Sequence, residues 1–323
     1  VFENRALIGS VDQFLKIKFP EDKAEGSVQG LILLQNWLAF RQKEQEKEPL
    51  FDADLTRLKL LVSYYTGEDQ ETLYEESLKK LAEKSKGLQV CSDVQYQRAL
   101  FLQQLGNSGY GQETGRNYLK EALSIARQGL KAWPKSEGGA LCSQLIQEIT
   151  LPRLALQMEE NIPSQAPITY RLDYNNVNQV YLNLYRLDAG YEEINNQRFI
   201  DRQFVERLNT LKPLKTEMKT LPDFGDYLNH SAELDLEYST GPGRYVLVVS
   251  PSPIRGGIDK LEVISYAFFQ VTNLSVFSKS LDDGRLDVLA LNRTTGMPVK
   301  EVAINVFGNN RRERDTQIIT STV

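Results

Sequence analysis

The first half of the chain carries apolar residues at helical spacing. Steps of four and three place Phe51, Leu55, Leu58, Val62 and Tyr65 on one helix face, and a glycine at position 67 provides a stop. A second amphipathic segment covers residues 71–84, and residues 28–41 predict a further helix. Three more helices are predicted: one opened by the capping-box spacing of Ser92 and Gln95, one from Leu119 that ends at Pro134, and one capped by Ser136. The pattern therefore predicts an α-helical, repeat-like domain over residues 1–150, built from helical hairpins.

The order of features in residues 118–149 resembles a degenerate tetratricopeptide repeat. Ala122 and Ala126 precede Trp133 and Pro134, and a new helix follows. Small residues at a helix crossing in an irregular bundle explain the same pattern, so both interpretations stay open. A solenoid would offer a concave surface to a partner; otherwise the helices support neighbouring domains.

After Thr150 the apolar period changes from 3.6 to two. Residues 232–238 alternate strictly between apolar and acidic side chains, and residues 170–174 alternate between apolar and charged side chains. Val180, Leu182 and Leu184 predict another strand. Residues 244–250, between Gly-Pro-Gly and Pro251, enclose a continuous run of β-branched and aromatic character, which predicts a central strand. Residues 261–271 are a further strand candidate. Short strands with regular turn signals predict a β-sandwich domain over residues 151–272, with the charged residues 199–218 as a loosely helical excursion.

A second β unit is predicted from Asn273 onward. Residues 274–280 and 285–292 flank Asp282-Asp283-Gly284, which is a hairpin signal, and the strand candidates 302–306 and 317–323 follow. Because so few strands cannot complete a sandwich, we interpret residues 273–323 as the start of a truncated domain and expect the natural protein to continue.

The stretch from Phe269 to Phe307 resembles the start of a macroglobulin-type β-sandwich domain. Its elements are Val271-Thr272-Asn273-Leu274, the turn Thr294-Thr295-Gly296-Met297-Pro298-Val299, and the strand that follows. Gly296 permits a tight turn, and Pro298 opens the next strand at an edge. Residues 242–247 and 176–187 are similar to earlier strands of the same family. A helical region followed by such domains resembles the large bacterial alpha-2-macroglobulin-like proteins.

This resemblance implies a fold of immunoglobulin-like macroglobulin β-sandwich domains after a tetratricopeptide-like helical region. It also implies a function: a non-catalytic scaffold or binding fragment of an envelope protein that traps or inhibits proteases. The implied partners are proteases or envelope proteins, and the implied location is the periplasm or cell envelope, with a lipid anchor allowed in a segment outside this sequence. The family's thioester motif is absent around Cys91 and Cys142.

Candidate chemistry is sparse, and we predict no enzyme. His230 is the only histidine, so a Ser-His-Asp or Cys-His site would have to use it, and its place before a strand favours a surface role. The count of histidines and cysteines excludes common zinc sites, and no phosphate loop or calcium loop occurs. We therefore name no catalytic, cofactor-binding or metal-ligating residue and no cofactor.

Composition adds three limits. The net charge of −5 favours no nucleic-acid partner, and no apolar run is long enough to span a membrane. Cys91 and Cys142 are interpreted as buried small residues, with a disulfide between them left open. The alternative function is a helical adaptor with generic immunoglobulin-like domains for surface assembly or adhesion; an enzyme using scattered carboxylates is a third hypothesis.

Overall fold

The computed structural model describes residues 2–19, 26–109, 115–187, 208, 211–238, 240–253, 263–282, 286–303, 305–307 and 316–318. The chain divides into two compact units. One, called the helical unit below, holds Val1–Leu151 together with Phe224–Leu228. The other, called the β unit, holds Pro152–Asp223 and Asn229–Val323. The predicted division into domains 1–150, 151–272 and 273–323 stays a prediction.

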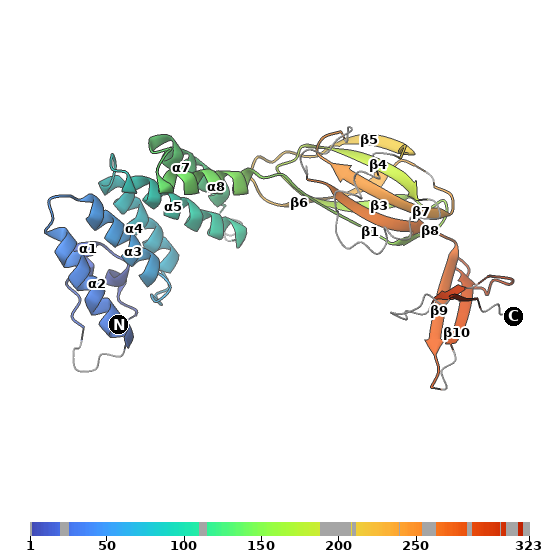
Figure 1. The fold of residues 1–323 in the computed structure, drawn as a ribbon, viewed down its shortest axis with the longest axis horizontal. Helices are drawn as coiled ribbons and strands as arrows, with labels where there is room; N and C mark the ends of the chain where they lie inside the picture. The colour runs from blue at the N-terminus through green and yellow to red at the C-terminus, as the bar shows by residue number, and fades with distance from the viewer. Residues whose placement is uncertain are drawn as a thin grey trace. The chain divides into compact units, whose positions relative to one another are not determined.

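Figure 1 shows the helices of the helical unit lying side by side. Their bounds are η1 (Arg5–Leu7), α1 (Val11–Phe14), α2 (Gly26–Gln42), α3 (Glu48–Leu61), α4 (Gln70–Lys84), α5 (Val90–Asn107), α7 (Tyr118–Ala132) and α8 (Glu137–Thr150). The predicted helices at 28–41 and 71–84 are confirmed within two residues. Asn117 and Ser136 cap α7 and α8 by accepting hydrogen bonds from the amides of Lys120 and Gly139.

The predicted start of α5 is wrong. The helix begins at Val90, after Gln89, and so Ser92 lies inside its first turn. The Ser92 hydroxyl donates to the Gln89 carbonyl and contacts the Ser136 hydroxyl at 2.8 Å. Capping-box spacing predicts an N-cap only where the serine hydroxyl is free to accept a hydrogen bond from the backbone amide three residues later.

Glycines let α5, α7 and α8 approach one another closely. A Cβ on Gly138 of α8 would lie 2.5 Å from the Asp93 amide nitrogen and 2.6 Å from the Ser92 carbonyl carbon. A Cβ on Gly129 of α7 would lie 2.7 Å from the Cys142 sulfur. Each of the three helices thus packs on both others around one apolar cluster that includes Leu102, Leu123 and Leu145.

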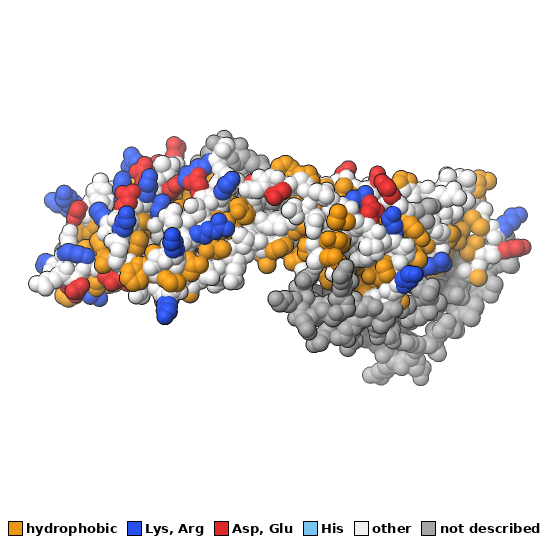
Figure 2. All heavy atoms as spheres, turned by 90° about the horizontal axis from the view of Figure 1, so that it is seen from above, with side chains coloured by type: hydrophobic (Ala, Val, Ile, Leu, Met, Phe, Trp, Pro, Cys, Tyr) orange, Lys and Arg blue, Asp and Glu red, His pale blue; other side chains and the backbone are white. Residues whose placement is uncertain are grey.

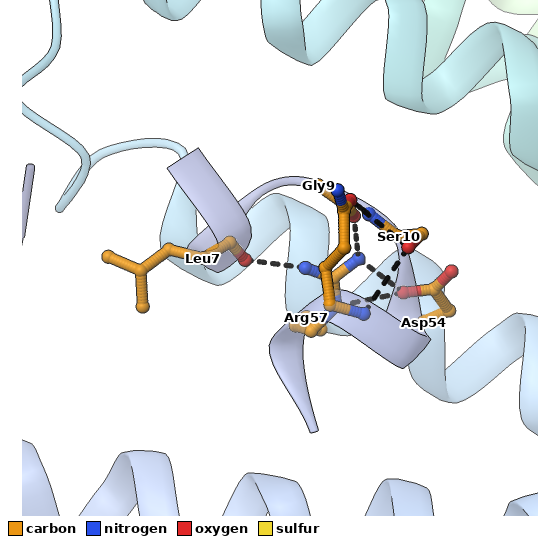
Figure 3. A network of polar contacts seen from close by, with 6 residues as sticks. Leu7, Gly9, Ser10, Asp54 and Arg57 are labelled. Carbon is orange, nitrogen blue, oxygen red and sulfur yellow. Dashed lines mark hydrogen bonds and ion pairs between the residues drawn. The ribbon is translucent and has the colours of Figure 1, made fainter. Parts of the chain in front are cut away.

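A buried arginine fixes the N-terminal segment to α3. The guanidinium of Arg57 lies among the carbonyls of Leu7 and Gly9 and the carboxylate of Asp54 (Figure 3). Its Nε and Nη2 donate to Asp54 Oδ1 at 2.8 and 2.6 Å, and Nη2 donates to the Gly9 carbonyl at 2.7 Å. Arg57 is fully buried, and its Cζ lies 5.2 Å from the centre of the Phe14 ring. One side chain therefore satisfies carbonyls of a segment that has few backbone partners of its own.

The β unit contains two sheets that share a core. Sheet one has the order β1 (Arg153–Met158), β3 (Ile168–Asn175) and β6 (His230–Leu236). Sheet two has the order β2 (Asn161–Ile162), β8 (Ser265–Val271), β7 (Gly243–Ser250), β4 (Gln179–Leu187) and β5 (Lys215–Thr220). Alternate residues of both sheets enter one apolar cluster, and Tyr170, Leu182 and Leu247 are almost fully buried there.

Two short antiparallel pairs follow. β9 (Leu274–Ser280) pairs with β10 (Leu286–Asn292), so that Phe277 faces Leu289 across the pair. β11 (Asn305–Phe307) pairs with β12 (Thr316–Ile318). The predicted hairpin around Asp282 is confirmed by the β9–β10 pairing, while the two residues after Asp282 lie outside the described part of the chain.

The predicted fold class is corrected. The described chain consists of α helices followed by mixed sheets, not of tetratricopeptide-like hairpins followed by immunoglobulin-like macroglobulin sandwiches. The two-residue strand β2 runs parallel to β8, whereas the other pairs are antiparallel. In the helical unit, α5, α7 and α8 pack mutually and do not form a simple stack of hairpins. Apolar alternation specifies which faces are buried but not which strands pair or in which direction.

The predicted excursion over residues 199–218 also needs correction at its end. Residues 215–218 belong to β5, which pairs antiparallel with β4. Its polar sequence resembled a surface helix because β5 lies at the edge of its sheet and alternates between half-buried and exposed side chains. Most of the remaining range lies outside the described residues.

We predict that Gly138→Ala destabilises the helical unit by about 1–3 kcal/mol, because the new methyl group would meet backbone atoms of α5 that cannot move aside cheaply. Both tryptophans, Trp37 and Trp133, belong to the helical unit, so their emission during urea unfolding reports this unit alone. Gly30→Ala is the matched control: its Cβ meets nothing within 4 Å, and we expect it to stabilise α2 by about 0.5–1 kcal/mol. Equal midpoints for the two variants would contradict the packing account.

We predict that Arg57→Met lowers the stability of the helical unit by about 3–5 kcal/mol, because it leaves Asp54 buried without its cation. Burial raises the pKa of Asp54, and the Arg57 guanidinium offsets that effect only in part. The double variant Asp54→Asn/Arg57→Met should recover part of the loss, since no uncompensated charge then remains. Urea unfolding followed by tryptophan emission checks both variants, and an unchanged midpoint for Arg57→Met would be the opposing result.

Candidate functional site

The residues that sequence reasoning considered for chemistry do not come together. His230 opens β6, half-buried, with its ring 5.9 Å from that of Tyr174. Cys91 and Cys142 are both free thiols, and burial raises the pKa of Cys142 to about 11. Among the described residues, no group of three or more histidine, cysteine or acidic side chains is placed to hold a metal ion, and no helix is long and apolar enough to cross a membrane.

The most distinctive surface of the helical unit lies on α2. This helix is apolar on two faces: Leu31 and Leu38 are buried in the core, while Leu33, Trp37 and Phe40 point outward. Leu33 is 68% exposed and Phe40 is 61% exposed. The three outward residues are spaced by four and three, so they form one ridge along the helix. A surface helix normally buries its apolar stripe against the core of its own unit. In α2 only one of the two apolar stripes is buried in this way.

α3 and the N-terminal segment complete a groove beside this ridge. Leu60 and the nearby Tyr64 are each 52% exposed, and Phe2 stacks against Tyr64 with ring centres 5.9 Å apart. With Leu34 and Trp37 they line a hollow of about 550 Å³, which we call the α2–α3 groove. Its volume falls within the range of ordinary ligand sites.

Hydrogen bonds and an ion pair of the N-terminal segment fix the position of Phe2. The amide of Thr66 donates to the Phe2 carbonyl at 3.0 Å, and Arg5 pairs with Asp69 at 2.8 Å. Tyr65 donates to the same carboxylate at 2.6 Å. These contacts and the buried Arg57 hold the N-terminal segment in the place where it forms the end wall of the groove.

The α2–α3 groove is electrically neutral. No charged side chain of the described residues lines it, and the hydroxyls of Thr56 and Tyr64 and the Trp37 indole N–H are its polar side-chain groups. Elsewhere on the helical unit, acidic and basic side chains are interspersed, with hydrophobic side chains between them (Figure 2). Such a lining recognises apolar surface and offers nothing to an ionic headgroup.

Sequence reasoning identified α2 but missed the groove. Residues 28–40 stood out as the longest apolar run, and a helix over 28–41 was predicted. The signal for an exposed face was available: the run is apolar almost all round, so it cannot bury every face against the few neighbouring helices. The contributions of Phe2 and Tyr64 depend on tertiary contacts that no local pattern encodes.

Comparisons with known proteins leave the predicted family resemblance untested. No protein-family model matches the chain, and no curated protein matches it. A solved structure of Pseudomonas fluorescens alkylpurine DNA glycosylase AlkC, bound to DNA containing an abasic site analog, is similar at 11% identity with a TM-score of 0.17. The match covers 79% of this chain and 82% of that chain.

This match differs in kind from three predictions made from the sequence. The matched protein is an enzyme bound to DNA, whereas the sequence predicted a protease-trapping scaffold or surface adaptor, no enzyme, and proteases or envelope proteins as partners without nucleic acid. We withdraw these three predictions, which rested on the resemblance to a macroglobulin-type family, on the presence of a single histidine, and on the net charge of −5. A likeness at this TM-score does not carry the glycosylase's activity or its DNA over to this chain. The resemblance to alpha-2-macroglobulin-like proteins and the predicted envelope location stay predictions.

Proposed function

We propose that the helical unit is a recognition module that binds an amphipathic helix in the α2–α3 groove. The observation that carries the proposal is the second apolar stripe of α2, Leu33, Trp37 and Phe40, which remains exposed beside Leu60 and Tyr64 of the neighbouring segment. Large exposed apolar clusters on a folded unit are typical of interaction surfaces.

The spacing of the ridge favours a helix as the bound element. Leu33, Trp37 and Phe40 follow the i, i+4, i+7 pattern along α2, and the first two of them line the groove. Leu60 and Tyr64 lie four residues apart and line the groove from the neighbouring segment. Two rows of this kind form a groove into which the side chains of a third helix interdigitate. The apolar anchors of that helix would therefore recur at three- and four-residue steps.

The exposure of the walls favours a partner that is itself half polar. Leu33, Leu60 and Tyr64, which line the groove, are each more than half exposed, so the groove opens along one side. A small apolar molecule seated there would keep much of its own surface in water, whereas an amphipathic helix presents its polar face to that side. Covering each exposed leucine or phenylalanine contributes roughly 1–2 kcal/mol at about 25 cal/mol per Å².

A fluorescence titration tests the proposal with the full chain. The variant Trp133→Phe leaves Trp37 as the only tryptophan. The probe is an 18-residue peptide with leucines at i, i+4 and i+7 steps and equal numbers of glutamate and lysine, and its scrambled form is the control peptide. We predict a saturable blue shift of Trp37 emission with the amphipathic peptide only, because the indole leaves water when the groove is filled.

Substitution of one wall residue supplies the specificity test. Leu60→Glu places a carboxylate in the apolar groove and should weaken binding by about tenfold or more. Met218→Glu is the matched control, since Met218 is 54% exposed on β5 of the β unit. Urea unfolding confirms that both variants fold. Equal binding by the two variants, or equal binding of the scrambled peptide, would refute the α2–α3 groove as the site.

A further inference from the structure

A second hollow of the helical unit has a different chemistry. It measures about 630 Å³ and is lined by one face each of α4, α5 and α7, with Trp133 at the end of α7. Cys91 and Arg98 of α5 lie seven residues apart and so share a face. Lys79 of α4 and Lys86, which follows α4, bring two further cations to the lining.

Arg98 is an incompletely satisfied cation within this hollow. Its Nη1 donates to Gln95 Oε1 at 2.9 Å, while its Nε is buried without a hydrogen-bond partner. Burial lowers the pKa of Arg98, and Glu75 and Glu83 offset this effect only in part. Glu75 is already engaged by Arg116, whose two Nη atoms bind it at 2.9 and 2.6 Å. A half-buried guanidinium without a carboxylate of its own has capacity left for an external anion.

The surrounding charges reinforce this preference. Lys79, Lys86 and Arg98 supply three positive charges to the lining, and Glu83 supplies the single negative charge. None of these four residues forms an ion pair with another described residue. The hollow therefore carries an excess of two positive charges in a chain whose net charge is −5.

We propose that this hollow binds a multivalent oxyanion, with the guanidinium of Arg98 taking two oxygens in its planar fork and Lys79 and Lys86 neutralising the remaining charge. Carboxylates and phosphates share the geometry that an arginine fork recognises. Trp133 and the aliphatic surface beside it supply an apolar wall for the body that carries the anionic groups. The proposal is independent of the α2–α3 groove, because the two sites share no lining residue.

Two residues of the hollow report on its occupancy. In the full chain with Trp37→Phe, the remaining tryptophan is Trp133, so its emission follows this hollow and not the α2–α3 groove. Cys91 is half-buried in the lining, whereas Cys142 is fully buried. Alkylation of Cys91 by iodoacetamide, followed by peptide mass spectrometry, therefore measures access to the hollow, and unreacted Cys142 confirms that the unit stays folded.

Citrate and pyrophosphate are the probes, with sodium chloride at matched ionic strength as the control. We predict a saturable change of Trp133 emission and at least about threefold slower alkylation of Cys91 with at least one probe. Saturation with citrate alone assigns the site to carboxylates, and saturation with pyrophosphate alone assigns it to phosphates. No saturation with either anion above the chloride control overturns the proposal.

Charge-neutral variants locate the binding residues. Arg98→Gln should weaken binding by about tenfold or more, and Lys79→Gln by a few fold. Lys79 is exposed and makes no described ion pair, so its variant tests the site even where Arg98→Gln fails to fold. Lys120→Gln, on an exposed part of α7 outside this hollow, is the matched control. Equal weakening by Lys120→Gln would show general charge attraction and would overturn the site.

Discussion

The buried guanidinium of Arg57 is the contact on which the arrangement of the helical unit depends. It binds the Asp54 carboxylate on its own helix and the carbonyls of Leu7 and Gly9 in the N-terminal segment. A charge buried to this degree is tolerated only where its hydrogen-bonding groups are matched. The interaction therefore ties a segment with little regular structure to α3, and that segment carries Phe2 to the end wall of the α2–α3 groove. The groove is thus a consequence of a polar contact in the core as much as of the apolar residues that line it.

Local patterns predicted the helices and the main strands well, because their physical causes are local. Apolar steps of three and four predicted α3 and α4, and Ser136 caps α8 as its position predicted. The prediction at Ser92 was wrong because that hydroxyl is used by the Gln89 carbonyl and by Ser136. Strand alternation identified the buried faces of β3 and β4 but gave no information on the parallel pairing of β2 with β8. The resemblance to a macroglobulin-type domain came from the turn and strand motifs of residues 269–307, not from alternation, and stays a prediction.

The candidate sites were harder to predict than the elements, for two different reasons. The apolar run of α2 was visible, but the sequence does not say which of its faces lacks a partner. The cationic hollow around Arg98 joins faces of three helices, and its charge imbalance depends on Arg116 having already engaged Glu75. Both features arise from how charges and apolar stripes are shared out after packing. Such a site depends on which charged and apolar side chains lack a partner in the folded unit, and the sequence alone does not specify those partners.

The exposed stripe of α2, together with α3 and the anchored N-terminal segment, is the surface that we propose receives a helix. Intermolecular nuclear Overhauser effects between the unlabelled amphipathic peptide and the isotope-labelled full chain test it most directly. The account predicts contacts from the peptide leucines to the Trp37 indole, the Leu60 methyl groups and the Phe2 ring, which all line the α2–α3 groove. Contacts confined to other parts of the chain, with none to these three side chains, would contradict it.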